Sequence, residues 1–197
     1  MELSKKVYRC FIAVDFESEI KSSIFKIVKK RTKEKRFIRS IPKENYHITI
    51  KFLGNIDEAQ INNIIGFISE VKTEEFEFIL DSCGYFNRRN PKVLWLSFKD
   101  KVFKFNRFAL EIINKLEEYG FKKEYKEFKP HITIARLKLR SNSERNKVEK
   151  VIENINLDIM KVKEFKATHI GLYKSELTGS GAVYTLLYKK ELTDELY

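Results

Sequence analysis

The tetrapeptide His-Ile-Thr-Ile stands at residues 47–50 and again at residues 131–134. The chain has only three histidines, so these two copies hold two of them. Isoleucine and threonine favour β-strands, and residues two apart in a strand point to the same face of the sheet. Each copy therefore presents one imidazole beside one hydroxyl, which pairs His47 with Thr49 and His131 with Thr133.

Two such pairs in one site suit acid–base chemistry on a phosphate ester. One neutral imidazole can accept a proton from an attacking water, and a second, protonated imidazole can donate one to the departing oxygen. An ordinary histidine pKa near 6.5 permits both states near neutral pH. The hydroxyls of Thr49 and Thr133 can donate hydrogen bonds to the non-bridging phosphate oxygens. One copy alone would be unremarkable strand sequence, but two identical copies favour a catalytic pair.

A zinc site is the competing interpretation of the two histidines. It needs a third ligand, and neither His169 nor a carboxylate stands at a suitable spacing from them. Cys10 and Cys83 are isolated in the sequence, which argues against zinc and against a disulfide framework. We therefore predict that the protein uses no metal and no cofactor.

The composition predicts a compact protein with a polyanionic partner. Of the 197 residues, 43% are hydrophobic, which is enough for a substantial core, and no stretch has the composition of a linker. The formal net charge of +11 favours RNA or DNA ends as the partner. The sequence has neither a signal-peptide pattern nor an apolar run long enough to span a membrane. We expect a single bilobal domain over residues 1–197 that is cytoplasmic, monomeric and not associated with a membrane.

The spacing of apolar residues predicts an alternation of strands and helices that repeats along the chain. The two motifs lie in corresponding positions of the two halves, so we expect two similar lobes, one from each half, related by a pseudo-twofold axis. Each lobe would be a small antiparallel sheet with helices on its outer face, and the motif strands would line the cleft between the sheets. Helices are expected at residues 17–30, 57–71, 102–116 and 141–155, and strands at residues 7–14, 37–41, 46–53, 76–80, 93–98, 131–137, 162–173 and 183–188.

These motifs resemble those of the 2H phosphoesterase superfamily, which is defined by paired His-x-Thr-x motifs. The paired motifs are specific for the superfamily, and the segments around them are most similar to one branch of it, the RNA 2′,3′-cyclic phosphodiesterases of bacteria and archaea, once called 2′-5′ RNA ligases. It runs through nearly the whole chain. The similar segments are the opening strand at residues 9–14, the first motif at 45–54, the central loop and strand at 87–96, the second motif at 128–136, and the C-terminal hairpin at 172–177 and 181–184.

The resemblance implies a bilobal α+β fold and metal-independent hydrolysis of an RNA 2′,3′-cyclic phosphate end to a 2′-phosphomonoester. It also implies that His47 is the proton donor and His131 the proton acceptor, an order that two identical motifs cannot supply by themselves. Reversible 2′-5′ ligation of RNA is a second activity implied by this branch.

Two alternatives stay open beside the RNA cyclic phosphodiesterase. The same site could act on a small cyclic nucleotide, a 2′-5′ oligoadenylate or ADP-ribose 1″,2″-cyclic phosphate. A non-catalytic module that binds RNA ends is the other alternative, although binding alone would not require two histidines.

Four further residues are candidates for substrate binding. Arg136 follows His131 by five residues, which places it on the opposite face of a regular strand, whereas the resemblance places it near the phosphate. Phe52 stands at the same distance after His47 and either lines a base pocket or belongs to the core. Arg88 and Arg89 lie in a predicted loop and either clamp the RNA backbone or are simply solvated.

Overall fold

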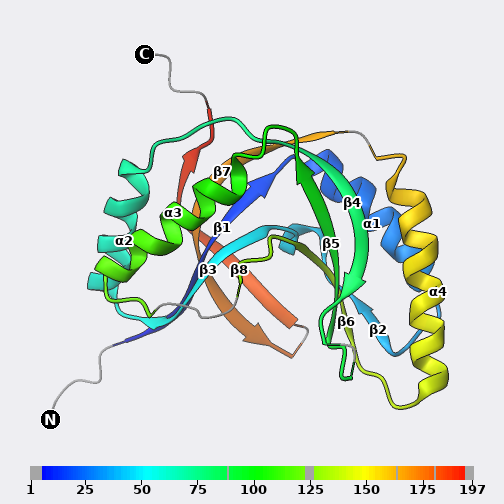
Figure 1. Ribbon diagram of the computed structural model, residues 1–197. Coiled ribbons are helices and arrows are strands. Elements are labelled where there is room, and N and C mark those ends of the chain that lie inside the picture. Colours follow the sequence, from blue (N-terminus) through cyan, green and yellow to red (C-terminus); the bar gives the residue numbers. More distant parts are fainter. Residues whose placement is uncertain (1–5, 88, 123–126, 163, 180, 194–197) are drawn as a thin grey trace, which may run out of the picture.

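The computed structural model describes residues 6–87, 89–122, 127–162, 164–179 and 181–193. These residues form an α+β fold, in which strands and helices alternate along most of the chain (Figure 1). In chain order the elements are β1 (Tyr8–Phe16), α1 (Ser18–Thr32), β2 (Ile38–Ser40), the 3-10 helix η1 (Lys43–Asn45), β3 (Ile48–Ile56), α2 (Glu58–Glu70), β4 (Glu77–Tyr85), β5 (Val93–Asp100), α3 (Phe105–Glu118), β6 (Ile132–Leu137), α4 (Asn142–Ile159), β7 (Phe165–Thr178) and β8 (Gly181–Glu191).

The strands pair in an antiparallel sheet that closes into a ring. The ring runs through β1, β3, β6, β5, β4 and β7 and back to β1, while β2 pairs with β6 and β8 pairs with β7. Two of its junctions are short. Strand β3 meets β6 where Ile48 lies opposite Ile132, and β4 meets β7 over two residue pairs. These two seams divide the strands into lobe A (β3, β1, β7 and β8) and lobe B (β2, β6, β5 and β4).

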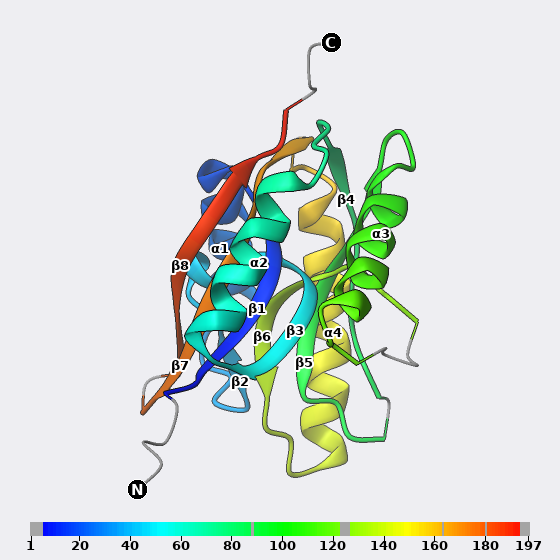
Figure 2. The same ribbon diagram turned by 90° about the vertical axis from the view of Figure 1, so that its left-hand side faces the viewer.

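Each lobe carries two helices on its outside. Helix α2 packs on β7 and β8, and α3 packs on β3, so both belong to lobe A. Helices α1 and α4 pack against each other and reach β2 and β4 of lobe B. The two pairs lie at opposite ends of the molecule in Figure 1, and Figure 2 shows α2 in front of the strands of lobe A. The predicted bilobal α+β fold with outer helices is therefore confirmed.

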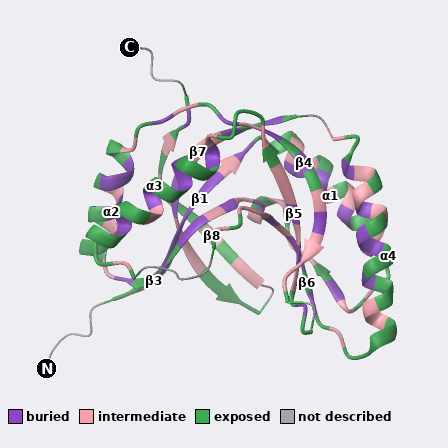
Figure 3. Ribbon diagram, in the orientation of Figure 1, coloured by how far each residue is buried: buried purple, intermediate pink, exposed green. Residues whose placement is uncertain are grey.

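The prediction that each half of the chain builds one lobe is wrong. Strand β1 pairs with β3 on one edge and with β7 on the other, so lobe A combines the first strand with the last two. The reason lies in the composition of β1, since Cys10, Ile12 and Val14 are buried in the core and Phe11 and Ala13 are buried on the other face. A strand that is apolar on both faces needs partners on both edges and cover on both sides (Figure 3).

One helix differs from its predicted start. Helix α3 begins at Phe105, where the backbone N–H donates to Asp100 Oδ2 at 2.6 Å, rather than at Val102. Val102 and Phe103 precede it in an exposed turn, and Phe103 has a φ of 56°. None of the helices in the described part of the chain is long and apolar enough to cross a membrane.

Candidate active site

The two motifs lie side by side at the seam between the lobes. Among the described residues, the pair that joins β3 to β6 is Ile48 opposite Ile132, and each of these isoleucines directly follows a motif histidine. The antiparallel pairing therefore brings His47 and His131 to one site from two strands, with Thr49 and Thr133 two residues further along. The juxtaposition predicted from the repeated tetrapeptide is present in the fold.

A backbone carbonyl orients each imidazole. His47 Nδ1 lies 2.8 Å from the carbonyl oxygen of Asn45, and His131 Nδ1 lies 2.8 Å from that of Lys129. A carbonyl oxygen can only accept, so Nδ1 carries the hydrogen in both rings. The other ring nitrogen, Nε2, is then the one that exchanges a proton. In the free site His47 Nε2 lies 3.0 Å from Thr49 Oγ1, so this hydroxyl donates to the neutral ring.

Aromatic rings enclose both histidines in a similar way. The ring of Phe11 is centred 4.9 Å from His47, and the ring of Phe86 is centred 4.9 Å from His131. Tyr184 adds an edge contact to His47 at 5.3 Å between ring centres. This burial lowers the pKa of His47 to about 4 and also lowers the pKa of His131. Both rings are therefore neutral in the free site at neutral pH.

A charged cluster behind His47 opposes part of this shift. The carboxylate of Asp15 raises the pKa of His47, while the ammonium group of Lys21, which is paired with Asp15, lowers it. His169, the third histidine, lies in this cluster and contacts the Tyr173 hydroxyl through Nε2 at 2.9 Å. Tyr173 in turn stacks at 6.4 Å from the His47 ring, so the cluster lies directly behind the site.

A bulge in each motif strand turns a later residue back toward the site. On β6, Thr133 pairs with Trp95 of the neighbouring strand and Ala135 pairs with Leu94, so Ile134 is an extra residue. The β1–β3 pairing likewise skips Ile50, the last residue of the first motif. Both strands consequently show the same order of burial over six residues, in which only the position five after the histidine is exposed.

This bulge bears on the alternatives that the sequence left open for two residues, Arg136 and Phe52. Arg136 does not point away from the site as a regular strand would require, because the extra residue restores it to the face of Thr133. Phe52 is not part of the core, since it is 59% exposed and its ring lies 5.9 Å from that of Phe11, which also contacts His47. The two residues hold equivalent places in the two motif strands.

The structure places Arg89 of the central loop beside α4. Arg89 is exposed there, and its carbonyl oxygen accepts a hydrogen bond from Arg145 Nη2 at 2.9 Å. Arg88 lies outside the described residues. An RNA contact through either arginine stays a prediction. Among the residues that the structure places, no group of three or more His, Cys, Asp or Glu side chains is arranged to hold a metal ion.

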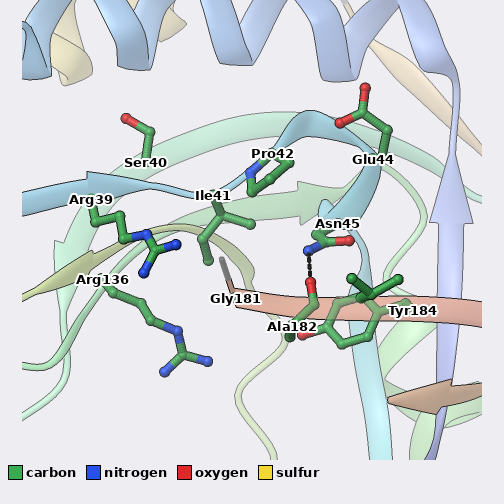
Figure 4. Close-up of a pocket in the computed structure, with 11 residues that line it drawn as sticks. Arg39, Ser40, Ile41, Pro42, Glu44, Asn45, Arg136, Gly181, Ala182 and Tyr184 are labelled. Atoms are coloured by element: carbon green, nitrogen blue, oxygen red, sulfur yellow. Dashed lines mark hydrogen bonds between the residues drawn. The ribbon is translucent and has the colours of Figure 1, made fainter. Parts of the chain in front are cut away.

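A cavity of about 370 Å³ opens next to the histidines, between the two lobes. Its walls come from β2, η1 and β6 of lobe B and from the start of β8 of lobe A (Figure 4). Asn45 and Tyr184 belong both to this wall and to the surroundings of His47, because Asn45 provides the carbonyl that orients the ring. Arg136 and Arg39 also line the cavity.

Sequence reasoning missed Asp15, Arg39, Phe11 and Phe86. Asp15 could have been found from the sequence, because it is a charged residue after the apolar run of β1. Strand alternation places it on the same face as Phe11 and Ala13. Arg39 gave no such signal, because its position depends on the pairing of a three-residue strand with β6. The approach of Phe86 to His131 likewise depends on tertiary packing.

The two motifs meet at one seam of the sheet, and comparison with known proteins identifies the family of the chain. The model of the LigT-like phosphoesterases matches the chain twice, at residues 14–95 and 103–184, and each match contains one copy of the motif. The chain belongs to the LigT-like phosphoesterase family, which confirms the predicted 2H phosphoesterase membership.

Individual relatives cover nearly the whole chain. A Methanocaldococcus jannaschii protein named RNA 2′,3′-cyclic phosphodiesterase is 35% identical over 91% of this chain and 98% of its own length. A Thermotoga maritima protein of the same name is 34% identical over 92% of this chain and 94% of its own length. Among solved structures, a Thermus thermophilus protein superposes with a TM-score of 0.74 at 25% identity, covering 95% of this chain and all of the other. Escherichia coli LigT, solved with 3′-AMP, shares the fold with a TM-score of 0.74 at 20% identity, over 95% of this chain and 99% of its own.

Proposed function

We propose that this protein is an RNA 2′,3′-cyclic phosphodiesterase that hydrolyses the cyclic phosphate end to a 2′-phosphomonoester. The observation that carries the proposal is the meeting of two imidazole–hydroxyl pairs at the β3–β6 seam, with Ile48 opposite Ile132. The names of relatives that align over most of the chain support the same activity. The net charge of +11 suits a polyanionic substrate.

Each of the two histidines carries out one of the two proton transfers of the reaction. Neutral His131 accepts a proton at Nε2 from water, whose oxygen attacks phosphorus. The bond from phosphorus to the ribose O3′ breaks, and protonated His47 gives its Nε2 proton to this departing oxygen. The phosphate is left on O2′ and the 3′-hydroxyl is restored. Because side chains supply both the acid and the base, the mechanism needs no metal ion.

The threonine hydroxyls stabilise the negative charge on the non-bridging phosphoryl oxygens. Thr49 and Thr133 are half-buried beside the two rings, so each hydroxyl can donate to a non-bridging oxygen. In the free site the Thr49 hydroxyl donates to His47 Nε2. When His47 becomes protonated this acceptor is lost, and the hydroxyl becomes available to the substrate phosphate.

His47 must take up a proton before it can act as the donor, because its pKa in the free site is about 4. An anionic cyclic phosphate beside the ring favours the protonated form, as does the nearby carboxylate of Asp15. Substrate binding and proton uptake are therefore coupled at this ring. Neutral His131 already has the state that an acceptor requires.

We predict that kcat/KM falls about tenfold for each unit of pH between pH 7 and pH 9, because the pKa of His47 in the free enzyme, about 4, lies well below this range. The pKa of His131 is lowered, so this ring is neutral throughout that range, while the protonated fraction of His47 shrinks tenfold per unit. The cyclic phosphate itself does not titrate there. Initial rates from pH 5 to pH 9 check the prediction, and a profile that is flat or rising between pH 7 and pH 9 would contradict a histidine donor.

A panel of substrates in EDTA tests the proposed activity against its alternatives. The candidates are an RNA oligonucleotide with a 2′,3′-cyclic phosphate end, a 2′,3′-cyclic mononucleotide, a 2′-5′ oligoadenylate and ADP-ribose 1″,2″-cyclic phosphate. We expect the largest kcat/KM on the oligonucleotide and no effect of EDTA. Salt-dependent binding of RNA without turnover would instead indicate an end-binding module.

A second reaction, ligation, could use the same groups in the same roles. An RNA 5′-hydroxyl can replace water as the partner of the cyclic phosphate, which joins two RNA ends through a 2′-5′ linkage. His131 would then take the proton from the 5′-hydroxyl, and His47 would again protonate O3′. This ligation, a monomeric state and a cytoplasmic location stay predictions.

A further inference from the structure

Two arginines from neighbouring strands face the same cavity beside the proposed active site. Arg39 on β2 lies directly opposite Arg136 on β6 in the strand register. Both side chains line the cavity between the lobes, and Figure 4 shows their guanidinium groups pointing to the same side, toward Gly181 and Ala182 of β8.

Residues of both lobes form the cavity, and one of its walls adjoins His47. A Cβ atom added to Gly181 would lie 3.7 Å from Arg39 Nη2, so this guanidinium reaches across the cavity to lobe A. On the other wall, Asn45 Nδ2 donates to the carbonyl oxygen of Ala182 at 2.7 Å and ties η1 to the start of β8. The same Asn45 orients His47 through its own carbonyl, so the cavity adjoins the proposed catalytic centre.

The charges of the cavity wall select an anion. Glu44 is the single acidic residue among the described residues that line it, against the two arginines, and the aromatic ring of Tyr184 forms part of the same wall. Burial raises the pKa of the Tyr184 hydroxyl, and the positive charge of Arg136 opposes part of this rise. Guanidinium groups bind phosphate oxygens through paired N–H donors, which makes a phosphate ester the expected ligand chemistry.

The geometry points to a subsite for the phosphodiester that joins the last two nucleotides of the RNA, with Arg39 and Arg136 as its cationic partners. This inference rests on the proposed function, since the cyclic phosphate itself occupies the two histidines and threonines. The strand that bears a 2′,3′-cyclic end continues only on its 5′ side, and its next phosphate is the nearest further anion. The cavity adjoining His47 would then make the enzyme prefer RNA to a mononucleotide.

The test compares three substrates: adenosine 2′,3′-cyclic phosphate, the ApA dinucleotide with the same cyclic end, and that dinucleotide with an uncharged methylphosphonate linkage. For the wild-type protein we expect a higher kcat/KM on ApA than on the mononucleotide, and loss of this advantage with the methylphosphonate. Arg39→Ala should lower the ratio of ApA to mononucleotide by about 10- to 100-fold, the effect of losing a hydrogen bond to a charged group. Arg39→Lys should give an intermediate ratio, since it keeps the charge and loses the paired donors.

Arg107→Ala is the matched control, because it removes the same side chain from the exposed surface of α3. It should leave the ratio as in the wild type. A wild-type ratio in Arg39→Ala, or equal use of the phosphodiester and the methylphosphonate, would overturn the subsite alone. No turnover of any cyclic phosphate by the wild-type protein would overturn the proposed function and the subsite with it.

Discussion

Replacing either motif histidine with alanine should lower kcat by about 10²–10⁴-fold, the usual contribution of a general acid or base. His47→Ala removes the group that protonates the departing O3′, and His131→Ala removes the group that accepts the proton of water. Because both act in one transition state, the double variant should be little worse than the slower single variant. Single-turnover rates on an RNA cyclic phosphate end measure these losses.

The third histidine is the control for this experiment. His169→Ala should have a much smaller effect, because His169 contacts Tyr173 and Thr168 and does not belong to either motif. Thermal unfolding of all variants separates a lost catalytic group from a lost fold. Wild-type kcat in His47→Ala or His131→Ala would refute the two-histidine mechanism.

Removing the hydroxyl of either motif threonine should lower kcat by about 10²–10³-fold, as for the loss of one donor to a developing oxyanion. Thr49→Val and Thr133→Val are suited to this test, since valine keeps the branched shape and strand preference of threonine. The loss should appear in kcat more than in KM if the hydrogen bonds strengthen in the transition state.

Serine at the same positions tests whether the hydroxyl is the group that matters. Thr49→Ser and Thr133→Ser retain the donor and should recover most of the activity. A valine variant with the kcat of the wild-type protein would show that its hydroxyl does not bind the reacting phosphate. A serine variant as impaired as the valine variant would assign the effect to packing.

The repeated tetrapeptide was sufficient to predict the superfamily, and the spacing of apolar residues together with that resemblance predicted the class of fold. Strand alternation alone pairs each histidine with its threonine on one face, and the structure adds that Ile48 and Ile132 meet at the seam. The boundaries of most elements followed from apolar spacing and local caps. One example is the start of α2, where Asp57 and Gln60 bond reciprocally at 2.9 and 3.1 Å.

The positions of Arg136 and Phe52 could not be predicted, because a bulge leaves no mark in the sequence of a strand. Ile50 and Ile134 look like ordinary inward residues, yet each is the extra residue that reverses the alternation after the motif. For a related reason, the sequence did not show that lobe A combines the first strand of the chain with the last two. Which strand edges pair depends on the packing of the whole ring, including the two short seams.

The effect of neighbouring charges on the pKa of His47 also could not be predicted without the tertiary structure. The opposing effects of Asp15 and Lys21 on its pKa depend on how β1 and α1 pack behind the site. A sequence can supply an ordinary histidine pKa near 6.5, but the lowering to about 4 comes from burial that only the fold defines.

Identification of the product tests the central claim most directly. An RNA oligonucleotide with a 2′,3′-cyclic phosphate end is incubated with the protein in EDTA, and the phosphate position is determined by ³¹P NMR. Protonation of O3′ by His47 predicts a 2′-phosphomonoester with a free 3′-hydroxyl, formed at the same rate with or without the chelator. A 3′-phosphate product, or no product at all, would contradict the account.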